Sequence, residues 1–197
     1  MDMLSEVSSD QVLGEWLKHE YRIREDIRKD ASSYLAKLGQ DESVVISPDY
    51  DNQEENEVRK TLWLQTPRGV IVTWVPSFSW KTVRLTESEI NHLETFQAND
   101  WEIRTRGTFE FSKLVEVLAS NEGRTYLSSV DQQWVSDIES WKNETRRIGL
   151  TGPLVIIREG DVIRLVEGYH RLAAALVLRI QGSKIQIPFF YLGEQIR

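Results

Sequence analysis

The feature that most constrains the fold of this chain is the order of short elements in its last quarter. Two apolar runs, 154–158 and 162–166, flank a Glu-Gly-Asp turn and predict a pair of antiparallel strands. Gly168 then precedes an alanine-rich helical stretch at 169–180, and residues 185–192 predict a closing strand. This order requires a small sheet with at least one helix packed against it.

Helical spacing of apolar residues dominates the sequence upstream. A long amphipathic pattern runs from about Ser8 to Leu38, with a break near Asp30. A Thr86–Glu89 capping box predicts the start of another helix. The expected helices of this part of the chain are 87–97, 112–119 and 129–147.

Several upstream segments instead have the composition of strands. Residues 58–64 and 70–75 predict a β-hairpin whose connection contains Pro67 and Gly69. Shorter strands are expected at 44–46, 80–85 and 101–106. We therefore expect an α+β fold in two parts. Residues 1–123 would form a helical and β-hairpin region, and 124–197 a module with a small mixed sheet and helices.

The composition excludes several kinds of chemistry. The 197 residues include no cysteine, which removes disulfides, thiolate catalysis and sulfur-ligated metals. The acidic first residues do not form a signal peptide, and the longest apolar run, 172–178, is too short to span a bilayer. We therefore expect a cytoplasmic protein without membrane association. The seven tryptophans are expected mainly in the core.

Charge is distributed unevenly along the chain. Residues 151–197 hold six Lys/Arg and four Asp/Glu, so this segment is +2, and the first 150 residues are −9. An acidic protein binds DNA poorly, because affinity for DNA depends on neutralising its phosphates. A small basic segment is better suited to a small phosphorylated ligand. The acidic N-terminal region could still bind a protein partner.

The residues 167–171, Glu-Gly-Tyr-His-Arg, form the one group that predicts specific chemistry. Gly168 lies where a strand turns sharply into a helix, and the first N–H groups of that helix can bind a phosphate. Arg171 offers a forked donor to phosphate oxygens, and His170 can donate a hydrogen bond or move a proton. The alternative is a helix start with a salt-bridged arginine and a surface histidine. Tyr169 could stack on a nucleotide base or pack in the protein.

Glu167 has three possible roles in this arrangement. A carboxylate beside an anion site is unfavourable unless it binds a metal ion, accepts a proton, or pairs with Arg171. The first two roles are catalytic and the third is structural. Arg158 and Arg164, on the two neighbouring strands, could reach a nucleotide or remain solvated at the sheet edge.

The run LVEGYHRLAAALVL, preceded by GPLVIIREGDVIR, resembles the ParB/sulfiredoxin superfamily, in which a strand ends in a Gly-x-(His/Arg)-Arg turn before a helix. The resemblance covers residues 130–192. It implies binding of a nucleotide, ATP/ADP or CTP, with Mg²⁺, at Gly168, Tyr169, His170 and Arg171. Tyr169 stands where sulfiredoxins have their cysteine, which excludes that activity. The chain also ends at Arg197, without the helix-turn-helix domain of partition proteins.

One branch of the superfamily resembles free-serine kinases, and other members carry a nuclease label. The Glu-Gly-x-His-Arg form is nearer to the stand-alone members than to partition proteins. The resemblance therefore implies Mg²⁺-dependent phosphoryl transfer to a small hydroxyl substrate, or nucleotide hydrolysis. Glu167, His170 and Arg171 would be the catalytic residues, and Glu167 would be the metal ligand. The alternative is a regulator without catalytic activity that retains the fold and binds a protein partner. A nuclease or another DNA-binding protein fits the acidic charge less well.

Overall fold

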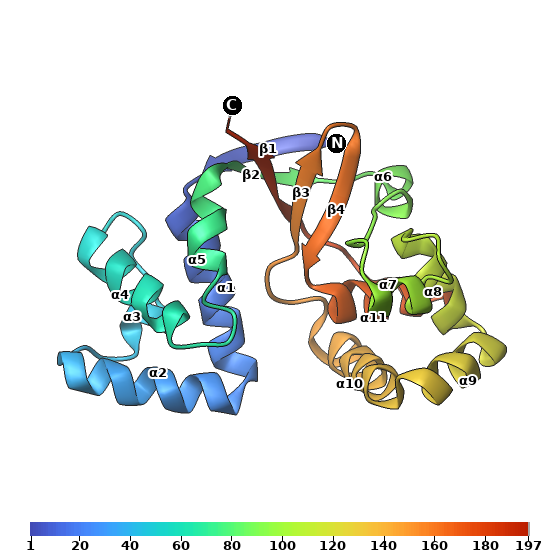
Figure 1. Ribbon diagram of the computed structural model, residues 1–197, viewed down its shortest axis with the longest axis horizontal. Helices are drawn as coiled ribbons and strands as arrows, with labels where there is room; N and C mark the ends of the chain where they lie inside the picture. The colour runs from blue at the N-terminus through green and yellow to red at the C-terminus, as the bar shows by residue number, and fades with distance from the viewer. Residues whose placement is uncertain (197) are drawn as a thin grey trace. The chain divides into compact units, whose positions relative to one another are not determined.

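The computed structural model describes residues 1–196, which form an α+β fold of helices with one five-stranded mixed sheet (Figure 1). The chain divides into two compact units. The N-terminal unit comprises residues 5–81 and the chain from Gly193 onward, and the C-terminal unit comprises residues 1–4 and 82–192. Residues 82–123 thus belong to the same unit as the helix and strands of the predicted module. None of the helices in residues 1–196 is long and apolar enough to cross a membrane.

The sheet has the strand order β1-β2-β5-β3-β4. Three of its strands continue from one unit into the other along the chain: β1 (Asp2–Val7), β2 (Phe78–Arg84) and β5 (Phe190–Gln195). The predicted antiparallel pair is confirmed as β3 (Val155–Glu159) and β4 (Val162–Glu167), in which Ile156 lies opposite Leu165 and Glu159 opposite Val162. The closing strand is shorter than expected and begins at Phe190 rather than at residue 185.

The helices of the N-terminal unit occupy most of its chain. They are α1 (Ser9–Ile23), α2 (Glu25–Leu38), α3 (Ser43–Ile46), α4 (Gln53–Leu64) and α5 (Ile71–Trp74), followed by the 3-10 helix η1 (Val75–Ser77). The predicted break in the first long helical pattern falls at Arg24 rather than near Asp30.

The predicted β-hairpin at 58–64 and 70–75 is wrong, because both segments are helical. Asn52 caps α4 by accepting hydrogen bonds from the N–H groups of Glu54 and Glu55. The buried side chains of α4 recur three and four residues apart, which places them on one helical face: Asn56, Arg59, Leu62 and Trp63. The strand expected at 44–46 is likewise a short helix, α3.

The C-terminal unit contains the predicted helix–strand–strand–helix order (Figure 1). Its helices are α6 (Glu87–Asn91), α7 (Asn99–Arg104), α8 (Phe111–Ala119), α9 (Asn121–Val130), α10 (Gln132–Ile148) and α11 (Tyr169–Ile180). The capping box of α6 is confirmed, although this helix ends at Asn91 rather than near residue 97. The strand expected at 101–106 is wrong, since α7 extends to Arg104.

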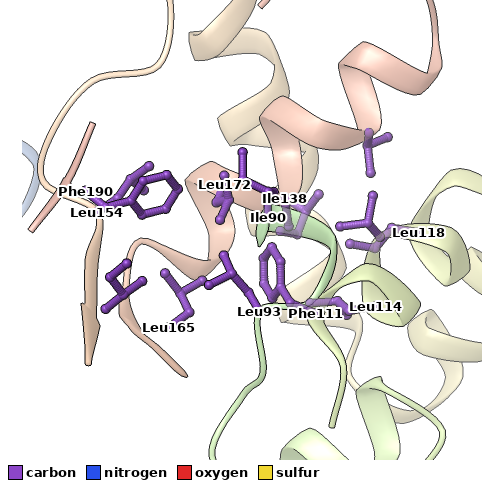
Figure 2. Close-up of a cluster of buried hydrophobic side chains, with 14 of the residues drawn as sticks. Ile90, Leu93, Phe111, Leu114, Leu118, Ile138, Leu154, Leu165, Leu172 and Phe190 are labelled. Atoms are coloured by element: carbon purple, nitrogen blue, oxygen red, sulfur yellow. The ribbon is translucent and has the colours of Figure 1, made fainter. Parts of the chain in front are cut away.

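The core of the C-terminal unit is formed where α8, α10 and α11 meet the β3–β4 pair. Figure 2 shows Phe111 beside Leu93 within this cluster, and both side chains are fully buried. On α11, Ala173, Ala174 and Ala175 are also fully buried. Small side chains let neighbouring elements approach the helix closely, so the second turn of α11 is fixed by close packing.

Five of the seven tryptophans are buried, as expected from the composition. They are Trp16, Trp63, Trp80, Trp101 and Trp134. In the N-terminal unit, Trp16 packs edge-on against Trp63 with ring centroids 5.9 Å apart. The indole N–H of Trp63 donates to the Leu13 carbonyl at 3.0 Å, which joins α4 to α1.

Candidate functional site

The turn from β4 into α11 requires glycine for two separate reasons. Gly168 is the N-cap of α11 and has φ = 96°, a left-handed conformation that favours glycine. A Cβ atom at this position would also lie 2.5 Å from Leu154 Cδ2, closer than packed side chains allow. No side chain among residues 1–196 caps α11, and the positive end of its dipole favours an anion at this turn.

Arg171 is directed into the protein rather than toward a ligand. Its side chain is only 3% exposed, and its guanidinium donates to the carbonyls of Thr151 and Pro153 at 2.8 and 2.7 Å. Nη2 also lies 3.3 Å from Oε1 of Glu167. These contacts fix the turn before β3. The contacts of Arg171 are therefore those of the alternative, a salt-bridged arginine at a helix start. Phosphate binding by this side chain stays a prediction.

Glu167 ends β4 and faces Arg171 one helical turn along the chain. Its carboxylate is 16% exposed, and the contact with Arg171 is the ion pair considered as its structural role. Within residues 1–196, no group of three or more His, Asp or Glu side chains is arranged to hold a metal ion. A magnesium ion at Glu167 would therefore need phosphate oxygens and water for its other ligands, as is common for Mg²⁺ in nucleotide sites.

Tyr169 packs into an aromatic cluster at the start of α11. Its ring lies 4.4 Å from the Trp101 ring, centroid to centroid, and its hydroxyl donates to the carbonyl of Leu165. Burial raises the pKa of Tyr169 well above its ordinary value, so the phenol is neutral. Of the two roles considered for Tyr169, packing accounts for these contacts.

His170 is the polar side chain of the turn with an unused hydrogen-bonding atom. Its ring lies 5.3 Å from the ring of Trp134, and its Nε2 is buried without a hydrogen-bond partner among the described residues. Burial is the main cause that lowers the pKa of His170, while the carboxylates of Asp137 and Glu167 oppose this effect. A buried polar atom without a partner is unfavourable, and a bound ligand could satisfy it.

The structure adds a cation that the sequence did not assign to this site. The guanidinium of Arg104 lies over the rings of both Trp101 and Trp134, at 5.0 and 4.9 Å from their centroids. It is held by Asp100 at 2.9 Å and by Asp131 at 2.6 Å. The hydrogen bond from Arg104 lowers the pKa of Asp131 below its ordinary value. Asp100 and Arg104 are spaced as a helical i, i+4 pair, a signal that the strand prediction for 101–106 concealed.

Arg158 and Arg164 are engaged with other parts of the C-terminal unit. Arg164 donates to Glu159 at 2.8 Å and to the carbonyl of Thr95 at 3.0 Å. Arg158 lies 3.5 Å from the sulfur of Met1. Glu167 to Arg171 follow one another through the turn into α11, whereas Arg158 and Arg164 are bonded elsewhere, and the role of the five residues as a site stays a prediction.

The low pKa of His170 leads to a testable pH dependence. The unfolded chain takes up a proton near the ordinary pKa of 6.5, whereas folded His170 resists protonation, so the free energy of unfolding should fall as the pH decreases below about 6.5. His170→Phe keeps a ring over Trp134 and removes this titration. Urea unfolding at pH 7.5 and 5.5 should show a smaller loss for His170→Phe than for the wild type. The difference should not exceed about 1.4 kcal/mol per pH unit. The exposed His92→Phe is the control, and equal slopes for wild type and His170→Phe would contradict the prediction.

Comparison of the chain with known protein families, with curated proteins and with solved structures finds no match. The resemblance to the ParB/sulfiredoxin superfamily therefore stays a prediction that rests on residues 130–192.

Proposed function

We propose that the protein binds the phosphate groups of a nucleotide at the start of α11. The observation that carries this proposal is the buried, unpartnered Nε2 of His170, beside a helix start that has no side-chain cap. A phosphate group accepts hydrogen bonds from helix N–H groups and is attracted by the positive end of the helix dipole. The N–H groups of Tyr169 and His170 would be the first donors. A neutral His170 that carries its proton on Nε2 could donate a hydrogen bond from that atom to a phosphate oxygen.

The proposal assigns Arg171 a positioning role. Because its guanidinium holds the carbonyls of Thr151 and Pro153, Arg171 acts on the site by fixing the turn and Glu167. The positive potential at the site would come from the helix dipole and from the neighbouring Arg104, partly neutralised by Asp100 and Asp131. A single ordered phosphate contact at a helix start is compatible with this modest charge.

Phosphoryl transfer or hydrolysis is the finer part of the proposal. Glu167 would act as the base or as the ligand of Mg²⁺, and either role requires it to exchange its contact with Arg171. The candidate nucleotides remain ATP, ADP and CTP, and the candidate acceptor is a small hydroxyl compound. As part of the same proposal, the protein acts in the cytoplasm. The second candidate is a regulator without catalytic activity that binds a protein partner, and the contacts of Arg171 with Thr151 and Pro153 are the observation in its favour.

Thermal unfolding with ATP, ADP, CTP and GTP, each with and without Mg²⁺, tests the binding site. At a hundredfold excess over Kd, a nucleotide should stabilise the wild type by about 2.7 kcal/mol. For a chain of this length, this corresponds to a rise in Tm of roughly 5–10 °C. His170→Phe should lose most of this shift, because the ring remains over Trp134 without its nitrogens.

The matched control is His92→Phe, which changes an exposed histidine of the same unit and should keep the full shift. Glu167→Gln keeps a hydrogen-bonding side chain next to Arg171, and loss of only the Mg²⁺-dependent part of the shift would assign the metal to Glu167. The proposal fails if none of the four nucleotides changes the Tm of the wild type, or if His170→Phe and wild type respond alike. If a nucleotide does bind, its consumption separates an enzyme from a regulator, because both hydrolysis and transfer to a hydroxyl acceptor consume it.

A further inference from the structure

The amino terminus is held within the C-terminal unit by both the backbone and the side chain of Met1. The ammonium nitrogen of Met1 lies 2.8 Å from Oε1 of Glu89 on α6, and the Met1 side chain is only 12% exposed. That side chain packs against the core cluster of the unit, and its sulfur lies 3.5 Å from Nη2 of Arg158 on β3. Residues 1–4, α6 and β3 all belong to this unit (Figure 1). Two elements that are distant in sequence therefore hold the amino terminus.

The carboxylate that pairs with the ammonium also caps α6. Oε2 of Glu89 accepts hydrogen bonds from the backbone N–H and the hydroxyl of Thr86, at 2.8 and 2.9 Å, while Oε1 faces Met1. The hydrogen bond from the Met1 ammonium is the main cause that lowers the pKa of Glu89 below its ordinary value, and the bonds from Thr86 lower it further. One ionised side chain thus connects the amino terminus to the start of a helix.

The exposure of β1 makes this connection important for the order of the first residues. β1 is an edge strand of the sheet, and the side chains of residues 2–6 are exposed. Exposed side chains contribute little burial energy, and terminal segments fray unless another contact ties them down. Met1 supplies such a contact at the start of the strand.

We propose that the α-amino group of Met1 is a modification site, at which acylation lowers the stability of the C-terminal unit. The acyl donor is a thioester: the amine nitrogen attacks its carbonyl carbon, an amide C–N bond forms as the C–S bond breaks, and the thiol leaves with the displaced proton. The amide is uncharged, so Glu89 loses its cation. Because the ammonium is paired with Glu89 in the folded protein, acylation takes place on the nascent or transiently opened chain.

The test compares the acetylated and free-amine forms of the 197-residue chain, separated by ion exchange and identified by intact mass. Acetylation should lower the Tm by about 2–4 °C, because a partly buried ion pair is lost. Hydrogen exchange localises the effect: the amides of residues 2–4 and of α6 should exchange roughly fivefold faster in the acetylated form. An unchanged Tm together with unchanged exchange would overturn the proposal.

Glu89→Gln separates the loss of the ion pair from crowding by the acyl group. Glutamine can keep the capping box but carries no charge, so acetylation should have little further effect on the Tm of this variant. The matched control is Glu87→Gln, in the same first turn of α6, where the side chain is 88% exposed. Glu87→Gln should show the full effect of acetylation. An equal loss of Tm on acetylation in wild type and in Glu89→Gln would overturn the role assigned to the Met1–Glu89 pair.

Discussion

Replacing Arg171 by alanine is expected to lower the free energy of unfolding by about 3–5 kcal/mol. The substitution leaves the carbonyls of Thr151 and Pro153 without their donor, and it leaves the mostly buried carboxylate of Glu167 without its cation. Loss of one member of a buried ion pair is far more harmful than loss of an exposed one. Urea unfolding, followed by tryptophan fluorescence, measures the effect.

Arg147→Ala is the matched control in the same unit. Its side chain is 69% exposed and pairs only with Glu144 one turn away among the described residues, so the expected change is within about 0.5 kcal/mol. A loss of less than about 1 kcal/mol in Arg171→Ala would contradict the structural role assigned to this arginine. The expected large loss of stability makes Arg171→Ala a poor probe of nucleotide binding, because a weakened fold and a weakened site would both lower the Tm measured with nucleotide.

Arg59→Ala is expected to destabilise the N-terminal unit by about 3 kcal/mol. Arg59 is 2% exposed, although it lies in the middle of α4. It donates to the carbonyls of Val44 and Asp49 at 2.8 and 2.7 Å, and it pairs with Glu55 at 3.0 Å. The substitution therefore removes the donor to the carbonyl of Val44 in α3 and to that of Asp49 between α3 and α4.

The exposed Arg22→Ala at the end of α1 provides the comparison for Arg59→Ala, with an expected change within about 0.5 kcal/mol. Hydrogen exchange localises the effect: amides of α3 and α4 should exchange faster in Arg59→Ala, because the segment 43–56 loses its buried donor. Unchanged protection in these helices would show that the arginine is dispensable for the fold of this segment.

The parts of the fold that were predicted correctly are those that local chemistry determines. Asp131 caps α10, Thr86 and Glu89 form the capping box of α6, and Gly168 starts α11, each within a few residues of the element it controls. The predicted hairpin failed because residues such as Val58 and Trp63 favour strands in isolation. Packing of Leu62 and Trp63 on one face, with the cap at Asn52, outweighs that preference.

The candidate site divides in the same way. Its five consecutive residues follow from the sequence, since a glycine between a strand and a helix defines the turn. The ring of Trp134 and the cation of Arg104 reach the turn from segments that are distant in sequence, so no local pattern could place them. The hydrogen bonds of Arg171 likewise go to carbonyls about twenty residues earlier in the chain, those of Thr151 and Pro153, so no local pattern predicts them.

The strand order also has a consequence for synthesis of the protein. β5 lies between β2 and β3 in the sheet, yet its residues are translated after those of both neighbours. Roughly a hundred residues separate β2 from β5, which a ribosome adds in about 5–20 seconds. During this interval the edge of β2 that faces β5 has no partner, and the facing edge of β3 has none from its own synthesis until that of β5. Unpaired strand edges can join other chains. The nascent chain is thus exposed to aggregation until its final strand is made, and a message truncated before Phe190 would yield a polypeptide that chaperones and proteases must remove.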